Sequence, residues 1–177
     1  MHKSEYSISK ISYVKADISR IMHACLKNWL IDPKILNFVS PSLNFPFRYT
    51  QWLKLYKSMT KKNIENQSYV IKKNKDLIVG HISLFVNRAD NEAHLFHLII
   101  DKKFRRNGLA QELIDFAEGY LIKKGTGTIR LYVNKKNKAM AKLIEKVGYV
   151  PKDTSKKFIS YKKIMIQSVL QKVDEHA

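Results

Sequence analysis

The sequence is poor in the residues that cross-link a chain or interrupt its regular structure. It contains one cysteine, Cys25, with four prolines and six glycines among 177 residues. A single cysteine excludes an internal disulfide framework and is typical of proteins from a reducing compartment. Cys25 also lies in an apolar stripe at helical spacing, which favours a small core residue over a nucleophile. We therefore expect the fold to rest on a hydrophobic core.

Long apolar runs are missing as well. No stretch approaches the roughly 20 apolar residues that cross a bilayer, and the first six residues, MHKSEY, lack the apolar segment of a secretory signal. We expect a cytoplasmic protein with no membrane partner. The length, with no internal repeat or linker, predicts one domain over residues 1–177. Residues 166–177 are expected to form either an extra C-terminal helix, suited to a dimer contact, or a tail.

Acidic residues are scarce. There are 15 of them against 33 basic residues, which gives a formal net charge of +18. The excess is lysine spread from Lys3 to Lys172, with six arginines, and arginine is the usual reader of bases and phosphates. A dispersed lysine coat favours a solvated surface over a nucleic-acid interface. The few carboxylates also argue against a polycationic substrate, which would need an acidic cleft.

The most informative stretch runs from His94 to Lys124. It opens with the apolar run HLFHLII, continues through the basic turn RRNGLA, and ends with apolar residues at helical spacing before Gly125. This order predicts a strand, a turn and an amphipathic helix. The start of a helix leaves unpaired N–H groups with a partial positive charge, and a glycine lets the backbone wrap an anion. With Arg105 and Arg106 beside it, the turn is a place to bind phosphate.

This turn resembles the acetyl-CoA loop of the GNAT acetyltransferases, whose pattern is Gln/Arg-x-x-Gly-x-Gly/Ala. Arg105, Gly108 and Ala110 fill the three fixed positions. Residues 137–149, NKAMAKLIEKVGY, resemble a second family signature, a helix that begins at asparagine and ends in Glu-Lys-x-Gly-aromatic. The turn lacks the Gly-Lys-Ser/Thr of a nucleotide P-loop and the three glycines of a dinucleotide fingerprint. The resemblance covers residues 66–163 well.

The resemblance implies an α/β (α+β) GNAT fold. A central twisted sheet, mixed but mostly antiparallel, of about six or seven strands would be flanked by about four helices. Its fourth and fifth strands, here 94–101 and 128–133, would splay apart to hold the pantetheine of acetyl-CoA, with N–H groups of the fourth strand on the thioester oxygen. No metal is expected. The implied cofactor-binding residues are Leu98, Ile99, Ile100, Arg105, Arg106, Asn107, Gly108, Leu109, Ala110 and Asn137.

Elsewhere, residue periodicity predicts further strands and helices. The predicted strands are 7–14, 67–73, 77–87 and 158–165, and the predicted helices are 17–30, capped by Asp17, a short helix capped by Thr50, and a helix capped by Asn137.

An acetyl transfer to an amine needs a base, because the amine must be neutral to attack. His94 and His97 lie on the predicted central strand, on opposite faces by its two-residue period. In the arylalkylamine branch of the family a histidine matches His94, and in the ribosomal-protein branch a glutamate stands near Glu92. His97, His94 and Glu92 therefore remain open as the catalytic residue. A purely structural role remains open for each histidine.

The sequence departs from the family at the leaving-group end. Many members carry a tyrosine seven residues after the asparagine of the helix, as general acid, and that position here is Ile144. A thiol with a pKa near 8.5 is a fair leaving group, so turnover does not require the tyrosine. Ile144 nevertheless favours an alternative, a CoA-binding sensor or subunit with weak or no catalysis.

The acceptor is expected to meet aromatic residues of the proline-punctuated loop at 40–47 and of the helix that follows. Phe45, Phe47 and Trp52 would either line the acceptor pocket or anchor the loop to the core. An aromatic rim suits a protein N-terminus, an arylalkylamine or another small hydrophobic amine. The leading hypothesis is an N-acetyltransferase that moves an acetyl group from acetyl-CoA to a primary amine by direct attack in a ternary complex. We expect a monomer or homodimer.

Overall fold

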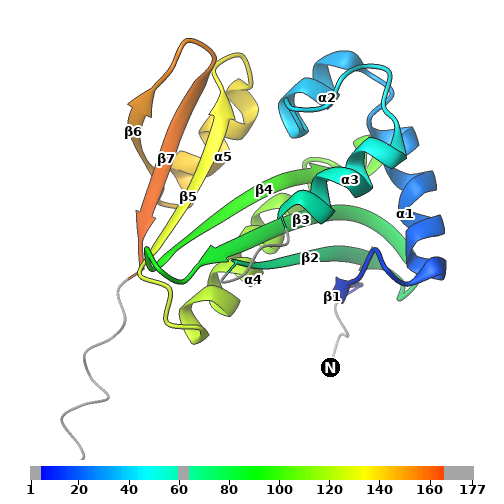
Figure 1. Cartoon of the computed structure of the whole chain (residues 1–177), viewed down its shortest axis with the longest axis horizontal. Helices are drawn as coiled ribbons and strands as arrows, with labels where there is room; N and C mark the ends of the chain where they lie inside the picture. Colours follow the sequence, from blue (N-terminus) through cyan, green and yellow to red (C-terminus); the bar gives the residue numbers. More distant parts are fainter. Residues whose placement is uncertain (1–4, 60–63, 166–177) are drawn as a thin grey trace, which may run out of the picture.

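The structure, a computed structural model, describes residues 5–59 and 64–165. The strands are β1 (Tyr6–Ile11), β2 (Ile64–Lys73), β3 (Leu77–Asn87), β4 (Glu92–Ile100), β5 (Thr128–Asn134), β6 (Val150–Thr154) and β7 (Phe158–Ile164). They form one seven-stranded sheet in the order β1-β2-β3-β4-β5-β7-β6 (Figure 1). Neighbours run antiparallel except β4 and β5, which are parallel. The predicted mixed, mostly antiparallel sheet is confirmed.

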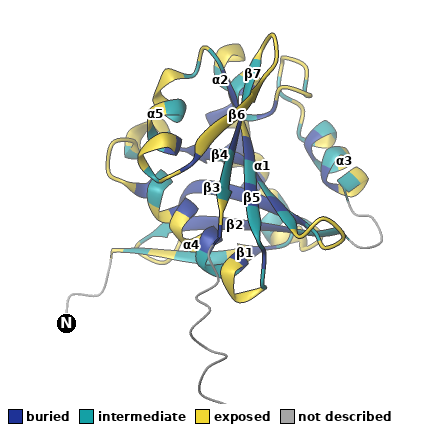
Figure 2. Cartoon of the chain, turned by 90° about the vertical axis from the view of Figure 1, so that its left-hand side faces the viewer, coloured by how far each residue is buried: buried dark blue, intermediate teal, exposed yellow. Residues whose placement is uncertain are grey.

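Helices cover both faces of this sheet. They are α1 (Ala16–Trp29), α2 (Pro33–Val39), α3 (Tyr49–Met59), the 3-10 turn η1 (Lys102–Phe104), α4 (Leu109–Lys123) and α5 (Lys138–Lys146). One cluster of buried side chains joins the sheet to α4 and α5, and a second joins it to α1, α2 and α3. Figure 2 shows the buried residues concentrated in the central strands, whereas the edge strand β6 is exposed along its whole length. Within the described residues no helix is long and apolar enough to cross a membrane.

Helix α2 was missing from the sequence-based prediction because it has only seven residues. Its start is nevertheless encoded locally. The Asp32 carboxylate accepts a hydrogen bond from the Lys34 N–H at 2.7 Å, and Pro33 occupies the first helical position. An Asp-Pro pair before an apolar run was therefore the signal to read.

Two predicted helix caps were wrong. Asp17 lies inside the first turn of α1, which begins after Lys15, and α3 begins at Tyr49, so Thr50 is a helical residue. The first strand ends at Ile11, three residues before its predicted end. The prediction for residues 166–177 lies outside the described residues.

Strands β4 and β5 pair only at their beginnings. Glu92, Ala93 and His94 pair with the three residues 128–130, and beyond this point the two strands diverge (Figure 1). The splayed fourth and fifth strands implied by the resemblance are confirmed, and β4 begins two residues earlier than predicted. A gap, called here the crevice, opens between them.

A β-bulge interrupts β4 at the height of the crevice. Ser83 of β3 pairs with Phe96, and His81 pairs with Ile99, so one residue of β3 faces both His97 and Leu98. His97 takes a positive φ of 51°. Because the bulge adds a residue, it turns the His97 ring to the face covered by α3, the same face that carries the ring of Phe96. His94 stacks on Phe85, which contacts Phe96 on that face, so the prediction that the two histidines face opposite ways was wrong.

Candidate functional site

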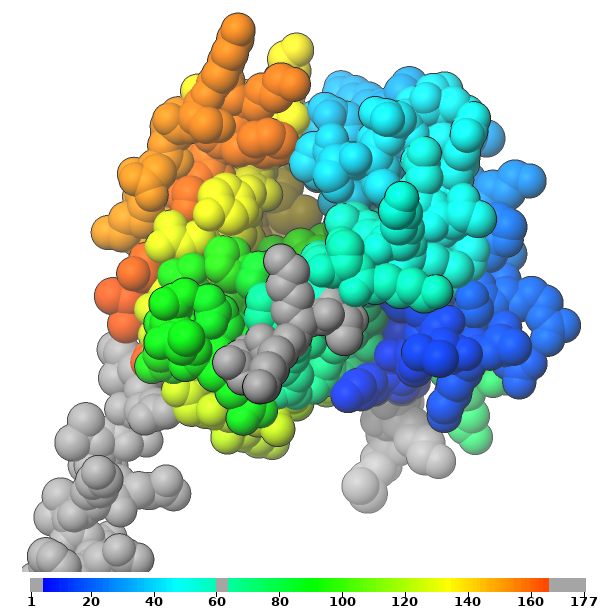
Figure 3. Space-filling model, in the orientation of Figure 1, coloured from blue at the N-terminus to red at the C-terminus, as the bar shows by residue number. Residues whose placement is uncertain are grey.

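A cavity of about 370 Å³ occupies the crevice. Figure 3 shows the surface hollowed between α2 and α3 on one side and β5 to β7 on the other. We call it the larger cavity. Its wall is formed by Phe38, Val39, Pro41, Ile82, Leu95, Phe96, His97, Leu98, Ile114, Leu131, Tyr132, Val133, Asn134, Asn137, Met140, Ile144 and Phe158. Most of these side chains are apolar, so the larger cavity suits a long, weakly polar group.

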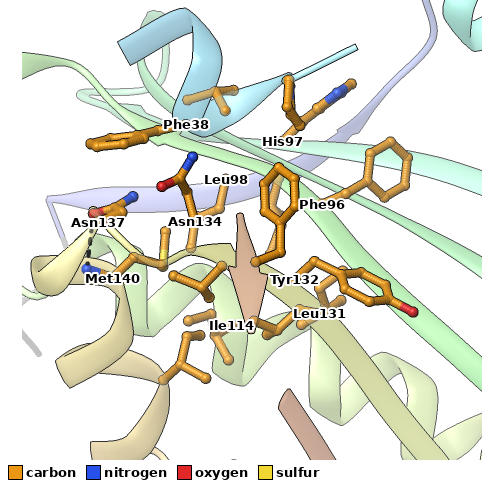
Figure 4. Close-up of a pocket in the computed structure, with 17 residues that line it drawn as sticks. Phe38, Phe96, His97, Leu98, Ile114, Leu131, Tyr132, Asn134, Asn137 and Met140 are labelled. Atoms are coloured by element: carbon orange, nitrogen blue, oxygen red, sulfur yellow. Dashed lines mark hydrogen bonds between the residues drawn. The ribbon is translucent and has the colours of Figure 1, made fainter. Parts of the chain in front are cut away.

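Two amide side chains are the polar part of this wall next to α5 (Figure 4). The Asn137 Oδ1 accepts a hydrogen bond from the Met140 N–H at 3.2 Å and so caps α5, as predicted. The Asn134 Oδ1 accepts from the Lys136 N–H at 3.0 Å. In both residues the oxygen is held by the backbone, which fixes the direction of the amide nitrogen. Asn134 was missed by sequence reasoning, because nothing local marks the last residue of a strand as a cavity residue.

A second cavity of about 220 Å³, the smaller cavity, lies at the start of α4. Its wall is formed by Ile100, Phe104, Arg105, Arg106, Gly108, Leu109, Ala110, Gln111, Leu143 and Lys146. Gly108 is the N-cap of α4 with a left-handed φ of 76°. A Cβ at this position would meet no atom within 4 Å, so the backbone conformation, and not crowding, is the reason for glycine here.

Of the predicted residues of the basic turn, five line the smaller cavity and one stabilises the turn itself. Arg105, Arg106, Gly108, Leu109 and Ala110 all line the smaller cavity. The Arg105 Nε also donates to the Ile100 carbonyl at 3.0 Å, which holds its side chain against the end of β4. Asn107 is not on the wall; its Nδ2 donates to the Phe104 carbonyl at 3.2 Å and so braces the turn.

The three predicted strand residues also separate. Leu98 lines the larger cavity and Ile100 the smaller one, whereas Ile99 lines neither and packs into the cluster under α1 to α3. Lys146 of α5 adds a cation to the smaller cavity that sequence reasoning did not include. Lys146 belongs to α5, whereas the loop precedes α4, so no local sequence pattern marks Lys146 as a cavity residue.

His94 belongs to a charged cluster beside the larger cavity. Its Nε2–H donates to the Glu92 carboxylate at 2.9 Å, and Arg130 binds the same carboxylate through two nitrogens at 3.2 Å. The imidazole is stacked between Phe85, at 4.5 Å between ring centres, and Tyr132, at 6.1 Å. Within the described part of the chain no hydrogen bond engages Nδ1 of His94. This nitrogen is therefore able to accept a proton.

Electrostatics leave this pair in different charge states. Burial lowers the pKa of His94 below 6.5, although the charge and hydrogen bond of Glu92 work to raise it. Burial works to raise the pKa of Glu92, but the hydrogen bonds and charge of Arg130 and the contact with His94 lower it below its usual value. At neutral pH the imidazole is neutral and the carboxylate is ionised.

His97 has a different environment. It is 7% exposed, and its ring stacks on Trp52 with 4.3 Å between ring centres. Nδ1 shares a hydrogen bond with the Tyr56 hydroxyl at 2.9 Å, and Nε2 shares one with the Ser40 hydroxyl at 2.9 Å. Burial holds the pKa of His97 well below 6.5, and the nearby His81 adds to this. Both ring nitrogens are occupied.

The predicted acceptor residues are not on the wall of either cavity. Trp52 is fully buried, Phe47 packs edge-on against it at 6.1 Å between ring centres, and Phe45 is 54% exposed. Of the two interpretations, the packing of Phe47 and Trp52 supports an anchor for the loop, whereas Phe45 is exposed. The aromatic side chains on the wall of the larger cavity belong to other elements. They are Phe38 of α2, Phe96 of β4, Tyr132 of β5 and Phe158 of β7.

Ile144 is buried and lines the larger cavity, so no hydroxyl stands at the position of the missing family tyrosine. Tyr132, which also lines this cavity, carries a hydroxyl and is 58% exposed. Tyr149, the last residue of the second family signature, also carries a hydroxyl, but it is buried and is not on the wall of either cavity.

A sequence model of the acetyltransferase (GNAT) family matches residues 29–149. The chain belongs to the GNAT family. The match includes the start of α4 and the whole of α5, which carry the two signatures described above. No curated protein matches the chain at a significant level.

Solved GNAT structures share this architecture. Spermidine N-acetyltransferase from Vibrio cholerae, in complex with CoA and spermine, is similar over 92% of this chain and 96% of its own, with a TM-score of 0.71 and 17% identity. The ribosomal-protein-S18-alanine N-acetyltransferase from Escherichia coli is similar over 93% of this chain and 97% of its own, with a TM-score of 0.62 and 18% identity. At such low identities the likeness establishes a common GNAT fold.

Proposed function

We propose that this protein is an acetyl-CoA-dependent N-acetyltransferase. The observation that carries the proposal is that the two cavities lie along the same three elements. Three elements contribute to both: β4 through Leu98 and then Ile100, α4 through Ile114 and then Ala110, and α5 through Ile144 and Leu143. An apolar slot and a basic pocket therefore follow one another along these elements. Acetyl-CoA has this order of chemistry, because its acetyl-pantetheine arm is weakly polar and its diphosphate is an anion.

The smaller cavity supplies what a diphosphate requires. The N–H groups at the start of α4 carry the positive end of the helix dipole, and Gly108 lets an anion approach them. Arg105, Arg106 and Lys146 surround the same space. The larger cavity would then hold the pantetheine between β4 and β5. Asn134 and Asn137 offer amide nitrogens to its carbonyl groups.

The acceptor amine loses a proton during the reaction, and we assign its removal to His94. Its Nδ1 is able to accept a proton, while Glu92 fixes the ring by holding Nε2–H. An α-amine titrates near 8, so about one molecule in ten is already neutral at pH 7, against roughly one in two thousand for a lysine side chain. A modest base is therefore enough for an α-amine.

The transfer step needs no covalent enzyme intermediate. The neutral amine nitrogen attacks the carbonyl carbon of the thioester, and the C–S bond breaks with its electron pair leaving on sulfur. His94 takes the proton from nitrogen, and the thiolate takes one from water or from the Tyr132 hydroxyl. An N–H group of β4 stabilises the negative charge on the carbonyl oxygen, and we assign this role to Leu98, which lines the larger cavity.

The acceptor class follows from the walls beside the reacting centre. The larger cavity is aromatic, through Phe38, Phe96 and Phe158. The partly buried carboxylate of Glu92, beside this cavity, is already neutralised by Arg130. Both features support a protein N-terminus or a small hydrophobic primary amine over a polycation. The two similar structures described above act on one acceptor of each kind: spermidine is a polycation, and the ribosomal-protein alanine is a protein acceptor.

A second function, a CoA-binding sensor or subunit without fast catalysis, is favoured by Ile144, which leaves that part of the cavity wall without a proton donor.

The test is the release of free thiol from acetyl-CoA with a panel of peptides and amines, together with thermal unfolding in the presence of acetyl-CoA. We expect acetyl-CoA to raise the unfolding temperature and apolar α-amines to release thiol faster than spermidine. Stabilisation without amine-dependent thiol release would support the sensor. The absence of stabilisation by acetyl-CoA would overturn both functions.

A further inference from the structure

A buried set of polar side chains lies between the sheet and α3, and the transfer step described above does not use it. We call it the histidine network. Its members are Ser40, Tyr13, Tyr56, Ser68, His81, Ser83 and His97. They come from distant parts of the chain, and His81 is fully buried at its centre. Buried polar groups of this kind are costly unless each has a partner, so the network calls for an explanation.

His81 makes the key contact. Its Nδ1 lies 2.9 Å from the carbonyl oxygen of His97, and because a carbonyl can only accept, Nδ1 must carry the proton. Its Nε2 therefore accepts from the Tyr13 hydroxyl at 2.8 Å. Burial lowers the pKa of His81 to about 4, so this neutral form persists at any physiological pH. The bulge leaves His97 and Leu98 without paired residues on β3, and His81 satisfies the carbonyl that the bulge exposes.

The direction of this carbonyl fixes the direction of a donor. The C=O of His97 and the N–H of Leu98 belong to one trans peptide, so they point in opposite directions. The C=O points at His81, which is a residue of β3. The His81 ring packs against Trp52 of α3, so the N–H of Leu98 points away from the face of the sheet that α3 covers. On the other face, Leu98 packs with Ile114 of α4 and Ile144 of α5, and all three line the larger cavity.

The ring of His97 holds the other end of the bulge. A positive φ costs about 1–2 kcal/mol for a residue with a Cβ, so the surroundings must retain it. Tyr56 and Ser40 each share a hydrogen bond with one ring nitrogen, and Trp52 stacks on the ring. With both nitrogens occupied, the ring has a fixed orientation.

We propose that His81 and His97 are positioning residues, which hold the bulged peptide of β4 so that the Leu98 N–H is aimed at the thioester carbonyl. This inference rests on the proposed function. It also gives His97 a role other than that of a base. Side-chain hydrogen bonds replace the missing strand partner, so the direction of the donor depends on two residues that take no part in the transfer step itself.

The test compares His81→Leu with His81→Asn. Leucine fills a similar volume without a donor, whereas the asparagine Nδ2 occupies the place of the histidine Nδ1 and can donate to the same carbonyl. The readout is the infrared stretching frequency of the thioester carbonyl in bound acetyl-CoA labelled with ¹³C at that carbon. A hydrogen bond from the Leu98 N–H lowers this frequency relative to free acetyl-CoA.

We expect a lowered frequency in the unaltered protein and in His81→Asn, and a return toward the free value in His81→Leu. The kcat of His81→Leu should fall about 10- to 100-fold, somewhat less than the loss of a whole oxyanion donor. The dissociation constant of CoA, which has no carbonyl at sulfur, should change little. Should His81→Leu fail to fold, Ser40→Ala, which frees one nitrogen of His97, is expected to shift the frequency in the same direction by less.

A folded His81→Leu or Ser40→Ala with unchanged frequency and kcat would overturn the inference while leaving the acetyltransferase intact. Loss of stability and of CoA binding with an unchanged frequency would mean that the network is structural only, which also overturns it. Failure of the unaltered protein to bind acetyl-CoA would instead remove the proposed function, and the inference with it.

Discussion

The two sides of the crevice are built in different ways. On the side of α4 and α5 the important features are local: Gly108 opens one helix and Asn137 caps the other. On the side of α1 to α3 the contacts join residues far apart in the chain, since Ser40 and Tyr56 reach His97 across 57 and 41 positions. A local feature can be removed without disturbing the core, whereas a long-range contact cannot. The two sides should therefore respond differently to substitution, one in ligand affinity and the other in stability.

The largest effect is expected on the α3 side. Trp52 is fully buried and stacks on His97, so Trp52→Ala should lower the free energy of unfolding by about 3–5 kcal/mol. Urea denaturation measures this loss. Trp52→Phe, which keeps an aromatic ring, is the matched variant and should lose much less. A Trp52→Ala protein of normal stability but without acetyl-CoA binding would contradict the division between the two sides.

On the α4 side, Gly108→Trp should weaken acetyl-CoA binding about 100-fold or more, equivalent to about 2.7 kcal/mol. The indole would occupy the smaller cavity, where a Cβ meets no atom within 4 Å. Gly108→Asn is the control, because asparagine tolerates the left-handed backbone better than other side chains and is small. Titration calorimetry gives the affinities. Equal affinity for acetyl-CoA in the tryptophan and asparagine variants would show that the diphosphate does not bind in the smaller cavity.

Between the two sides lies His94, and its removal should act on the rate alone. His94→Ala is expected to lower kcat about 30- to 100-fold at neutral pH. A base works only when deprotonated, so the rate of the unaltered protein should fall as pH drops through the pKa of His94, which lies below 6.5. Glu92 raises that pKa, and Glu92→Gln should therefore move the acidic limb to lower pH. An acidic limb that persists unchanged in His94→Ala would assign the base elsewhere.

The smallest effect concerns a lysine of α5. Lys146 lines the smaller cavity, while Lys142, one helical turn earlier, does not. Both are exposed. Lys146→Gln should weaken acetyl-CoA binding about threefold at low salt, in keeping with the modest energy of exposed charge pairs. The difference should shrink as salt is added. Lys142→Gln is the control, and an equal loss in both variants would point to a diffuse lysine field rather than a contact.

The same division explains how far the sequence could be read. Gly108 and Asn137 could be predicted because a left-handed turn and a helix cap need particular residue types at particular places. The central strands and α4 could be predicted because their periodicity is clear over many residues. These elements belong mostly to the side where short-range rules decide the structure.

The rest depends on contacts that no local pattern encodes. His97 was expected to face away from His94 because a regular strand alternates, and the bulge is set by β3 and α3 together. Helix α2 is too short for periodicity to reveal. Asn134 and Lys146 become cavity residues only when β5 and α5 fold against the start of α4. In each case the missing information lies in a distant segment of the chain.

The three residue pairs that join β4 to β5 also have a mechanical meaning. They divide the sheet into a four-stranded part, β1 to β4, and a three-stranded part, β5 to β7, which are paired at one end only. A ligand bound between the two parts would contact both strands, β4 and β5, where they no longer pair with each other. The empty protein would then be the less rigid of its two states, and its ligand would serve as the missing part of its own architecture.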